Sequence, residues 1–166
     1  MGTRPRGHSP GRERPLRGYL AALAAFGAYN TGWAVMICRR GRALPERPDR
    51  RDLALTAVAT FRLSRLLTKA SVTRPLRAPF TVYDGPEGPA EVSEHPREGE
   101  SAATIGELLT CPFCLSVWLV STLTAAQLLW PRPTRTAMGA LTALAAADAL
   151  QLAYAALESR ATASAD

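Results

Sequence analysis

The sequence predicts an all-α integral membrane protein, a helical bundle of three to four helices with a C-terminal helical hairpin. Residues 19–38 contain no charged side chain, and neither do residues 108–131. About 20 helical residues cross the hydrocarbon core of a bilayer, which is roughly 30 Å thick. A third segment, residues 136–157, has a similar length and one charged residue, Asp148. No strand-like alternation interrupts this helical pattern.

Composition divides the chain into six segments. Proline, glycine and charged residues mark the boundaries, because they disfavour both helix interiors and the hydrocarbon core. In order, we expect a disordered Arg/Pro-rich tail at 1–17, a transmembrane helix at 18–38, an Arg-containing helix at 52–68, an acidic flexible loop at 69–107, a transmembrane hairpin headed by Cys-Pro-Phe-Cys at 108–157 and a tail at 158–166.

Residues 52–68 permit two interpretations. Asp52 can cap the helix, and Arg62, Arg65 and Lys69 are spaced so that they share one face. In the first interpretation the helix lies on the membrane surface and its arginines extend toward lipid phosphates. In the second it spans the membrane, and an arginine has a buried partner.

The distribution of basic residues predicts which side of the membrane holds the cysteines. If residues 52–68 stay on the surface, thirteen of the twenty basic residues lie on the side of the acidic loop. If they cross, that side holds ten basic residues and the other side eight. Short cytoplasmic loops carry an excess of Lys and Arg. Both counts predict a multi-pass protein of the cell membrane with the dithiol end in the cytoplasm.

The chain is basic, with twenty Lys and Arg against fourteen Asp and Glu. Most of the positive charge flanks the first apolar segment, at residues 4–17 and 39–51, where contact with anionic lipid explains it. No interleaved aromatic motif accompanies it, so we expect no nucleic-acid partner. The expected partners are membrane lipid and either a second copy or another membrane protein. The abundance of Arg and Ala is typical of a GC-rich bacterial genome.

Cys111 and Cys114 stand at the start of the longest uncharged segment. Backbone amides at a helix N-terminus stabilise a thiolate, so Cys-x-x-Cys at this place suits dithiol redox chemistry, with Cys111 as nucleophile and Cys114 as resolving residue. A metal site needs about four ligands, and Cys38, His8 and His95 lack the spacing to complete one. We therefore assign no residue as a metal ligand and expect no cofactor. Packing, redox and metal roles for the cysteines all stay open.

Asp148 is a second unusual residue, because an acid inside an apolar span is costly and is usually paired or functional. In a hairpin that turns near residue 133, Asp148 lies level with Trp118, and Gln151 lies near the cysteine pair. Our hypothesis is that Asp148 pairs with Arg62 or Arg65, or moves protons to a cysteine. The alternative is a helix-packing hydrogen bond within the bundle.

Three motifs carry a family resemblance: Ala-Thr-Phe-Arg-Leu-Ser-Arg-Leu-Leu-Thr at 59–68, Val-Thr-Arg-Pro-Leu-Arg at 72–77 and Gly-Glu-Leu-Leu-Thr-Cys-Pro-Phe-Cys-Leu-Ser-Val-Trp at 106–118. Together they resemble the bacterial membrane proteins grouped as domain of unknown function 1360 (DUF1360), over about residues 52–157. The resemblance implies a multi-helix membrane protein and supplies no reaction. The residues that match the pattern form the candidate site: Arg62, Arg65, Arg74, Pro75, Cys111, Cys114 and Trp118.

From these observations we expect a structural or interaction protein of the membrane rather than an enzyme. The main alternative is a membrane-embedded thiol-disulfide oxidoreductase or redox sensor that uses Cys111 and Cys114. A metal-binding membrane protein is the second alternative.

Overall fold

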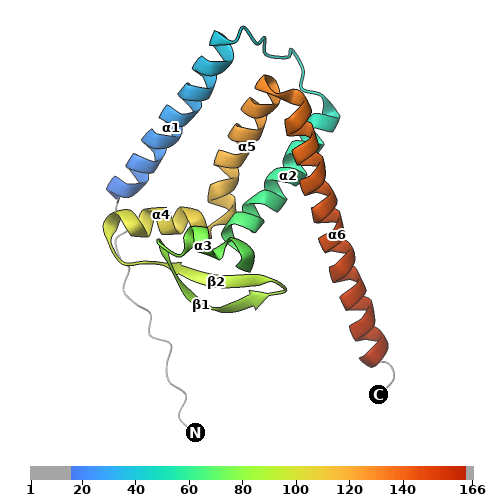
Figure 1. The fold of residues 1–166 in the computed structure, drawn as a ribbon. Coiled ribbons are helices and arrows are strands. Elements are labelled where there is room, and N and C mark those ends of the chain that lie inside the picture. Colours follow the sequence, from blue (N-terminus) through green and yellow to red (C-terminus); the bar gives the residue numbers. More distant parts are fainter. Residues whose placement is uncertain (1–15, 164–166) are drawn as a thin grey trace.

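The computed structural model describes residues 16–163 (Figure 1), so the tail expected at the N-terminus lies almost wholly outside the described part. The described residues are mostly helical, as predicted, and also contain one small sheet. In chain order the elements are α1 (Leu16–Arg39), α2 (Arg50–Thr68), the 3-10 turn η1 (Ser71–Thr73), α3 (Arg74–Arg77), β1 (Thr81–Gly88), β2 (Glu91–Pro96), α4 (Glu100–Thr110), α5 (Pro112–Leu129) and α6 (Pro131–Ala163).

Three helices are long and apolar enough to cross a membrane: α1 from Gly18, α5 and α6. Helix α2 packs against both α5 and α6, and α1 packs against α5 and α4 (Figure 1). The loop between α1 and α2 lies near the turn between α5 and α6. We call this the basic end, residues 39–52 and 130–135, and the opposite end, residues 69–114, the dithiol end.

The buried face of α2 carries small residues. Its buried side chains follow a helical spacing: Thr56, Ala59, Thr60, Ser64 and Thr68. Most of their hydroxyl groups donate to backbone oxygens of the preceding turn, as Thr68 Oγ1 does to Ser64 O at 2.8 Å. Small side chains let helices approach closely, and local hydrogen bonds satisfy most of the buried hydroxyl groups. Thr60 Oγ1 is the exception, because it is buried and has no hydrogen-bond partner among the described residues.

The acidic loop expected at 69–107 contains a β-hairpin, which corrects the all-helical prediction. Strands β1 and β2 pair antiparallel, with Thr81 opposite Pro96 and Val82 opposite His95. The register shifts twice along the hairpin, and these irregularities remove the regular alternation by which a strand is recognised in sequence. The hairpin docks on the chain after α2, where Val92 N donates to Lys69 O at 2.9 Å.

The N-terminus of α2 also differs from the expectation. Asp49, rather than Asp52, is the N-cap, and its carboxylate accepts hydrogen bonds from the amides of Arg51 and Asp52. The helix therefore starts one turn earlier than predicted, which places Asp52 inside the first turn and leaves its carboxylate available for another partner.

Two helices meet at the dithiol end, inside and just after the segment expected to be a flexible loop. Helix α4 begins at Glu100 and ends at Thr110, whose hydroxyl donates to Gly106 O at 2.9 Å. Cys111 is the N-cap of α5.

Helix α6 is longer than predicted and reaches Ala163, so most of the tail expected at 158–166 is helical. Only Trp130 separates it from α5, because Pro131 and Pro133 fit the first turn of a helix, where no amide hydrogen is needed. Helices α5 and α6 diverge from this turn, and α2 lies between them (Figure 1).

Candidate functional site

The C-terminus of α2 is capped by side chains from the segment that follows it. Arg77 Nη1 donates to Leu67 O and to Thr73 Oγ1, both at 2.7 Å, and Nη2 donates to Ala70 O at 3.0 Å. Thr73 Oγ1 in turn donates to Leu66 O. The last carbonyl groups of a helix have no partner within the helix and carry partial negative charge. The Val-Thr-Arg-Pro-Leu-Arg motif therefore closes the end of α2.

Arg77 also forms a buried ion pair with Glu94 of β2. The Nε to Oε2 distance is 2.6 Å, and the two side chains are only 1% and 2% exposed. Arg74 Nε lies 3.4 Å from the other carboxylate oxygen of Glu94. Four hydrogen bonds from one guanidinium thus connect α2, η1 and the hairpin, which satisfies the requirement that a buried charge be fully paired.

Arg65 of α2 and Lys69, the residue that caps its C-terminus, reach the hairpin as well. Arg65 Nε and Nη2 donate to the two carboxylate oxygens of Glu91 at 3.0 and 2.5 Å, and Lys69 Nζ donates to Glu87 at 2.6 Å. Acidic residues of the segment expected to be a flexible loop are thus partners for the basic face of α2. These pairs fix the orientation of the hairpin relative to α2.

Arg74 and Pro75 of the candidate site belong to this same junction. Pro75 occupies the first turn of α3, where its fixed φ favours a helix start. The guanidinium of Arg74 lies over the ring of Tyr83, with its central carbon 4.6 Å from the ring centroid. Both residues position the short helix that carries Arg77.

Arg62, about two thirds of the way along α2, pairs with Asp148 and is one of the two partners expected for this acid. Arg62 Nε lies 2.7 Å from Asp148 Oδ2, and the side chains are 17% and 37% exposed. Nε is buried and does not have the geometry of a hydrogen bond to any described group, so the contact is an ion pair without good hydrogen-bond alignment. This pair joins α2 to α6.

The cysteine pair lies where α4 ends and α5 begins. The Sγ of Cys111 accepts a hydrogen bond from the amide of Cys114 at 3.2 Å, and both thiols are free. Cys114 is exposed and Phe113 between them is 84% exposed, so a partner molecule can reach this turn. The N-cap position thus directs the Cys111 sulfur toward the first-turn amides of α5, next to the Cys114 thiol.

Gln151 does not join the cysteine pair, and Trp118, one turn after Cys114 on α5, contacts α1. Trp118 packs between helices, with ring centroids 5.0 Å from Phe26 and 5.3 Å from Tyr29 of α1. Gln151 is exposed on α6, which diverges from α5 (Figure 1). Asp148 pairs with α2 rather than with a thiol, since α2 lies between α5 and α6.

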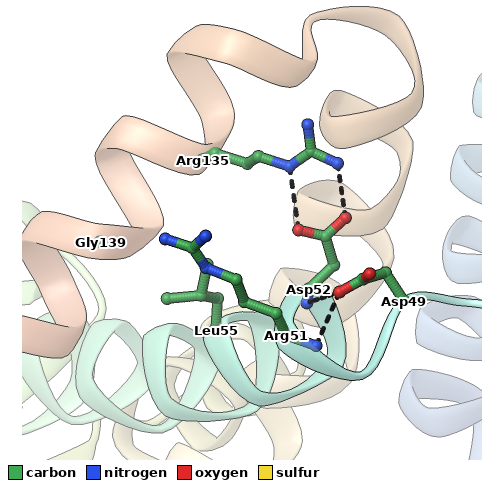
Figure 2. A pocket seen from close by; sticks show the side chains of 6 residues that line it. All are labelled: Asp49, Arg51, Asp52, Leu55, Arg135 and Gly139. Carbon is green, nitrogen blue, oxygen red and sulfur yellow. Dashed lines mark hydrogen bonds and ion pairs between the residues drawn. The ribbon is translucent and has the colours of Figure 1, made fainter.

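A cavity of about 350 Å³ lies at the basic end, between the first turns of α2 and α6 (Figure 2). Arg135 Nε and Nη2 donate to the two carboxylate oxygens of Asp52 at 2.9 and 2.6 Å. These bonds lower the pKa of the Asp52 carboxyl below its usual range. The lining residues are Asp49, Arg51, Asp52, Leu55, Arg135 and Gly139.

The family described as "Protein of unknown function (DUF1360)" matches residues 55–154, which is more than half of the chain. The chain belongs to the DUF1360 family. This confirms the resemblance drawn from the three motifs. No curated protein and no solved structure matches the chain.

In this DUF1360 protein, sequence reasoning missed the residues that organise the dithiol end. Arg77 lies in the motif at 72–77 but was not among the predicted site residues, and its partner Glu94 falls in the segment expected to be a flexible loop. The signal that could have found them is a run of acids following a basic helix, because charges brought together by a short connection tend to pair. In residues 16–163, no group of three or more His, Cys, Asp or Glu side chains could hold a metal ion.

Proposed function

We propose that this DUF1360 protein is a four-span membrane protein with a structural or interaction role, in which residues 53–68 of α2 form the fourth span. The observation that supports this most strongly is the packing of α2 against two apolar helices, α5 and α6. The 16 residues 53–68 make a helix roughly 24 Å long, somewhat shorter than the hydrocarbon core of roughly 30 Å, and a bilayer accommodates such a mismatch by thinning locally. If its two neighbours cross the bilayer, α2 lies at the same depth.

The charges of α2 are compatible with this position. Asp52 precedes the proposed span and pairs with Arg135 at the basic end, while Arg65 and Lys69 pair with the hairpin at the other end. Only Arg62 lies near the middle, and its charge is balanced by Asp148. A charge within a membrane is tolerated when it is paired and faces another helix.

The outward-facing residues of the apolar helices suit lipid contact. Many large apolar side chains there are exposed, which is unfavourable in water but not in a bilayer. They include Leu20, Leu23 and Val35 of α1, Val117 and Val120 of α5, and Leu144, Leu150, Leu152 and Tyr154 of α6.

Inserted protease sites can test whether α2 crosses. One site is inserted in the loop at residues 43–47 and another at the hairpin turn, residues 88–90, and each protein is placed in vesicles of known orientation. If α2 crosses, the two sites are cleaved in vesicles of opposite orientation. Cleavage of both sites in the same vesicles contradicts the proposal.

The proposed orientation places the dithiol end in the cytoplasm. With α2 crossing, that end and the two chain termini carry ten basic residues in sequence, and the basic end carries eight. The excess of two favours a cytoplasmic dithiol end. The protease-site experiment reports this orientation as well, because the hairpin site is then cleaved in inside-out vesicles.

A redox function is a second candidate, and the hydrogen bond from the Cys114 amide to Cys111 Sγ favours it. The Cys111 thiolate would attack a disulfide of a partner protein, forming a mixed disulfide while one partner sulfur leaves and takes up a proton. The Cys114 thiolate would then attack Cys111 Sγ and release the second partner thiol. The partner is reduced by two electrons, and the chain is left with an oxidised Cys111–Cys114 pair.

Trapping of thiols in cells separates the two candidates. Rapid alkylation followed by a mass-shift gel detects whether Cys111 and Cys114 alternate between free and bridged forms, and Cys38→Ser removes the third thiol from the readout. A structural role predicts that both cysteines stay reduced. It also predicts that Cys111→Ser is tolerated, so that the variant reaches the same level in the membrane as the wild type. A mixed disulfide that accumulates in Cys114→Ser supports the redox function instead, because the resolving thiol is missing.

A further inference from the structure

Helix α6 carries two polar residues on one side of an otherwise apolar segment. Asp148 and Gln151 have the spacing i and i+3, so they lie next to each other on the helix surface. The side chain of Asp148 is 37% exposed even though it pairs with Arg62, and Gln151 is exposed. Within residues 16–163, neither the Asp148 carboxylate nor the Gln151 amide takes part in a hydrogen bond. Both side chains therefore have hydrogen-bonding capacity to spare.

Both residues lie at the depth of the proposed α2 span. Helices α2 and α6 run in the same direction from the basic end, and Arg62 of α2 is level with Asp148 of α6 (Figure 1). Arg62 precedes the end of α2, at Thr68, by roughly 9 Å, whereas Gln151 follows Asp148 by only roughly 4.5 Å. Gln151 therefore lies within the span, where the hydrocarbon chains of lipids offer no hydrogen-bond partner.

No helix of the described chain covers α6 beyond Asp148. Residues 149–163 are exposed on every side of the helix, and this part of α6 diverges from the rest of the bundle (Figure 1). Ala147 and Ala155, one turn before and one turn after Gln151, are exposed on the same side. Because their side chains are small, a second helix can approach closely enough to reach the polar pair.

The face formed by Asp148 and Gln151 is complementary to itself, since the Gln151 amide supplies donors and the Asp148 carboxylate is an acceptor. Two copies with the same orientation in a membrane can be related by a two-fold axis only if that axis is perpendicular to the membrane. Their α6 helices are then parallel, and the same face of each copy meets. Each copy offers a donor to the acceptor of the other, so a second copy of this chain fits this face.

We propose that two copies dimerise through α6 within the membrane, with Gln151 donating a hydrogen bond to the partner subunit's Asp148. Asp148 then takes part in two interactions, the ion pair with Arg62 in its own copy and the hydrogen bond to the second copy. The proposal rests on the membrane crossing of α2, which places both polar residues below the membrane surface. Polar side chains at that depth promote helix association, because lipid chains cannot satisfy them.

Single-molecule photobleaching of the labelled full chain in liposomes, over a range of protein-to-lipid ratios, measures the dimer fraction. The wild type should form dimers that dissociate on dilution. Gln151→Leu should raise the dissociation constant about tenfold, because two symmetry-related hydrogen bonds are lost. Ala155→Leu should also weaken the dimer, since a large side chain prevents close approach. Ala153→Leu changes the opposite side of the same helix, so it is the matched control and should keep the wild-type dissociation constant.

Cysteine cross-linking tests the same face without changing Gln151. The three native cysteines are first replaced by serine, and a single cysteine is then introduced at one of two exposed positions of α6. On oxidation in the membrane, Ala155→Cys should form a disulfide between two copies, and Ala153→Cys should form little.

Three results would overturn the dimer. A wild type that stays monomeric at the highest protein density would leave this face to lipid or to a different membrane protein. Dimers of Gln151→Leu as tight as those of the wild type would exclude the hydrogen bond, and equal cross-linking of Ala153→Cys and Ala155→Cys would indicate random collision. If the protease sites still show that α2 crosses, any such failure concerns this interface alone.

Discussion

At the residue scale, Arg77 and Glu94 explain why the dithiol end has a defined structure. Burial of each charge alone would be costly, but the four hydrogen bonds of Arg77 recover that cost within one geometry. The same guanidinium closes the C-terminus of α2 and holds β2. The planar guanidinium of arginine has five N–H donors, so it can bond to the α2 carbonyl groups and to Glu94 together. The ammonium group of a lysine cannot.

Replacement of Arg77 should therefore destabilise the protein strongly. Arg77→Met leaves Glu94 buried without its main partner, and we expect the free energy of unfolding to fall by about 3–5 kcal/mol. Arg77→Lys should lower the free energy of unfolding by a smaller amount, because lysine keeps the positive charge but lacks the planar guanidinium. Thermal unfolding of the purified protein in detergent measures the effect. Arg97→Met, an exposed arginine of the dithiol end, is the control and should change little.

The pair between Arg62 and Asp148 gives a second prediction at this scale. Arg62→Asp or Asp148→Arg alone brings two like charges together inside the bundle and should lower the amount of protein in the membrane severalfold. The double exchange restores opposite charges and should recover most of that loss. Quantitative immunoblots of membrane fractions measure the amount of each variant in the membrane. Failure of the double exchange to recover would show that the two residues do not act as a pair.

At the element scale, helix α2 depends on a narrow face of small residues. Ala59 has no exposed surface, whereas Ala57, two residues away, is exposed. Large side chains on the buried face would push α2 away from α5 and α6, and the exposed face tolerates them.

The same substitution, alanine to leucine, at a buried and at an exposed position of α2 tests how this helix packs. Ala59→Leu should destabilise the protein by about 1–3 kcal/mol through overpacking. Ala57→Leu should change stability by less than about 0.5 kcal/mol, since it alters only the surface. Unfolding midpoints of the two variants in the same detergent provide the comparison. Equal effects would mean that α2 does not pack on this face.

The contact between α4 and the hairpin depends on Gly106. A methyl group at this position would lie 2.7 Å from Phe80 O and 2.8 Å from Pro96 Cβ, closer than real contacts. Gly106→Ala should therefore loosen the hairpin and increase amide hydrogen exchange in β2. In α1, Gly32→Ala meets nothing within 4 Å and should leave that exchange unchanged or slower.

The elements differ in how well the sequence predicts them. Apolar length identified α1, α5 and α6, because a helix exposed to water carries charged side chains on its outer face and these segments carry almost none. Helix caps were misplaced by one turn where two acids compete, as at Asp49 and Asp52. The hairpin was missed because Gly85, Pro86 and Gly88 sit within β1, and its stability comes from distant arginines rather than from strand propensity.

The candidate site was predictable only in part. Arg62 and Asp148 could be matched in advance, since few partners exist for a charge in an apolar helix. The link between Gln151 and the cysteines was expected from a closely packed hairpin of α5 and α6. That expectation failed because α2 inserts between those two helices, a tertiary feature that helix lengths alone do not encode.

At the scale of the whole molecule, the two ends of the bundle differ in charge and chemistry. The basic end carries the cavity between α2 and α6, and the dithiol end carries a hairpin held by ion pairs and an accessible cysteine pair. Helix α2 connects both ends and bears an ion-pair partner at each. Under the four-span proposal, whether α2 crosses the bilayer determines on which side the cysteines lie.

The native cysteines give the most direct test of that path. Cys38 lies in the last turn of α1 at the basic end, and Cys114 is exposed at the dithiol end. Variants that keep only one of these two thiols are treated in intact cells with a membrane-impermeant maleimide, with and without permeabilisation. If α2 crosses, Cys38 is labelled in intact cells and Cys114 only after permeabilisation. Labelling of both thiols from the same side would contradict the four-span account.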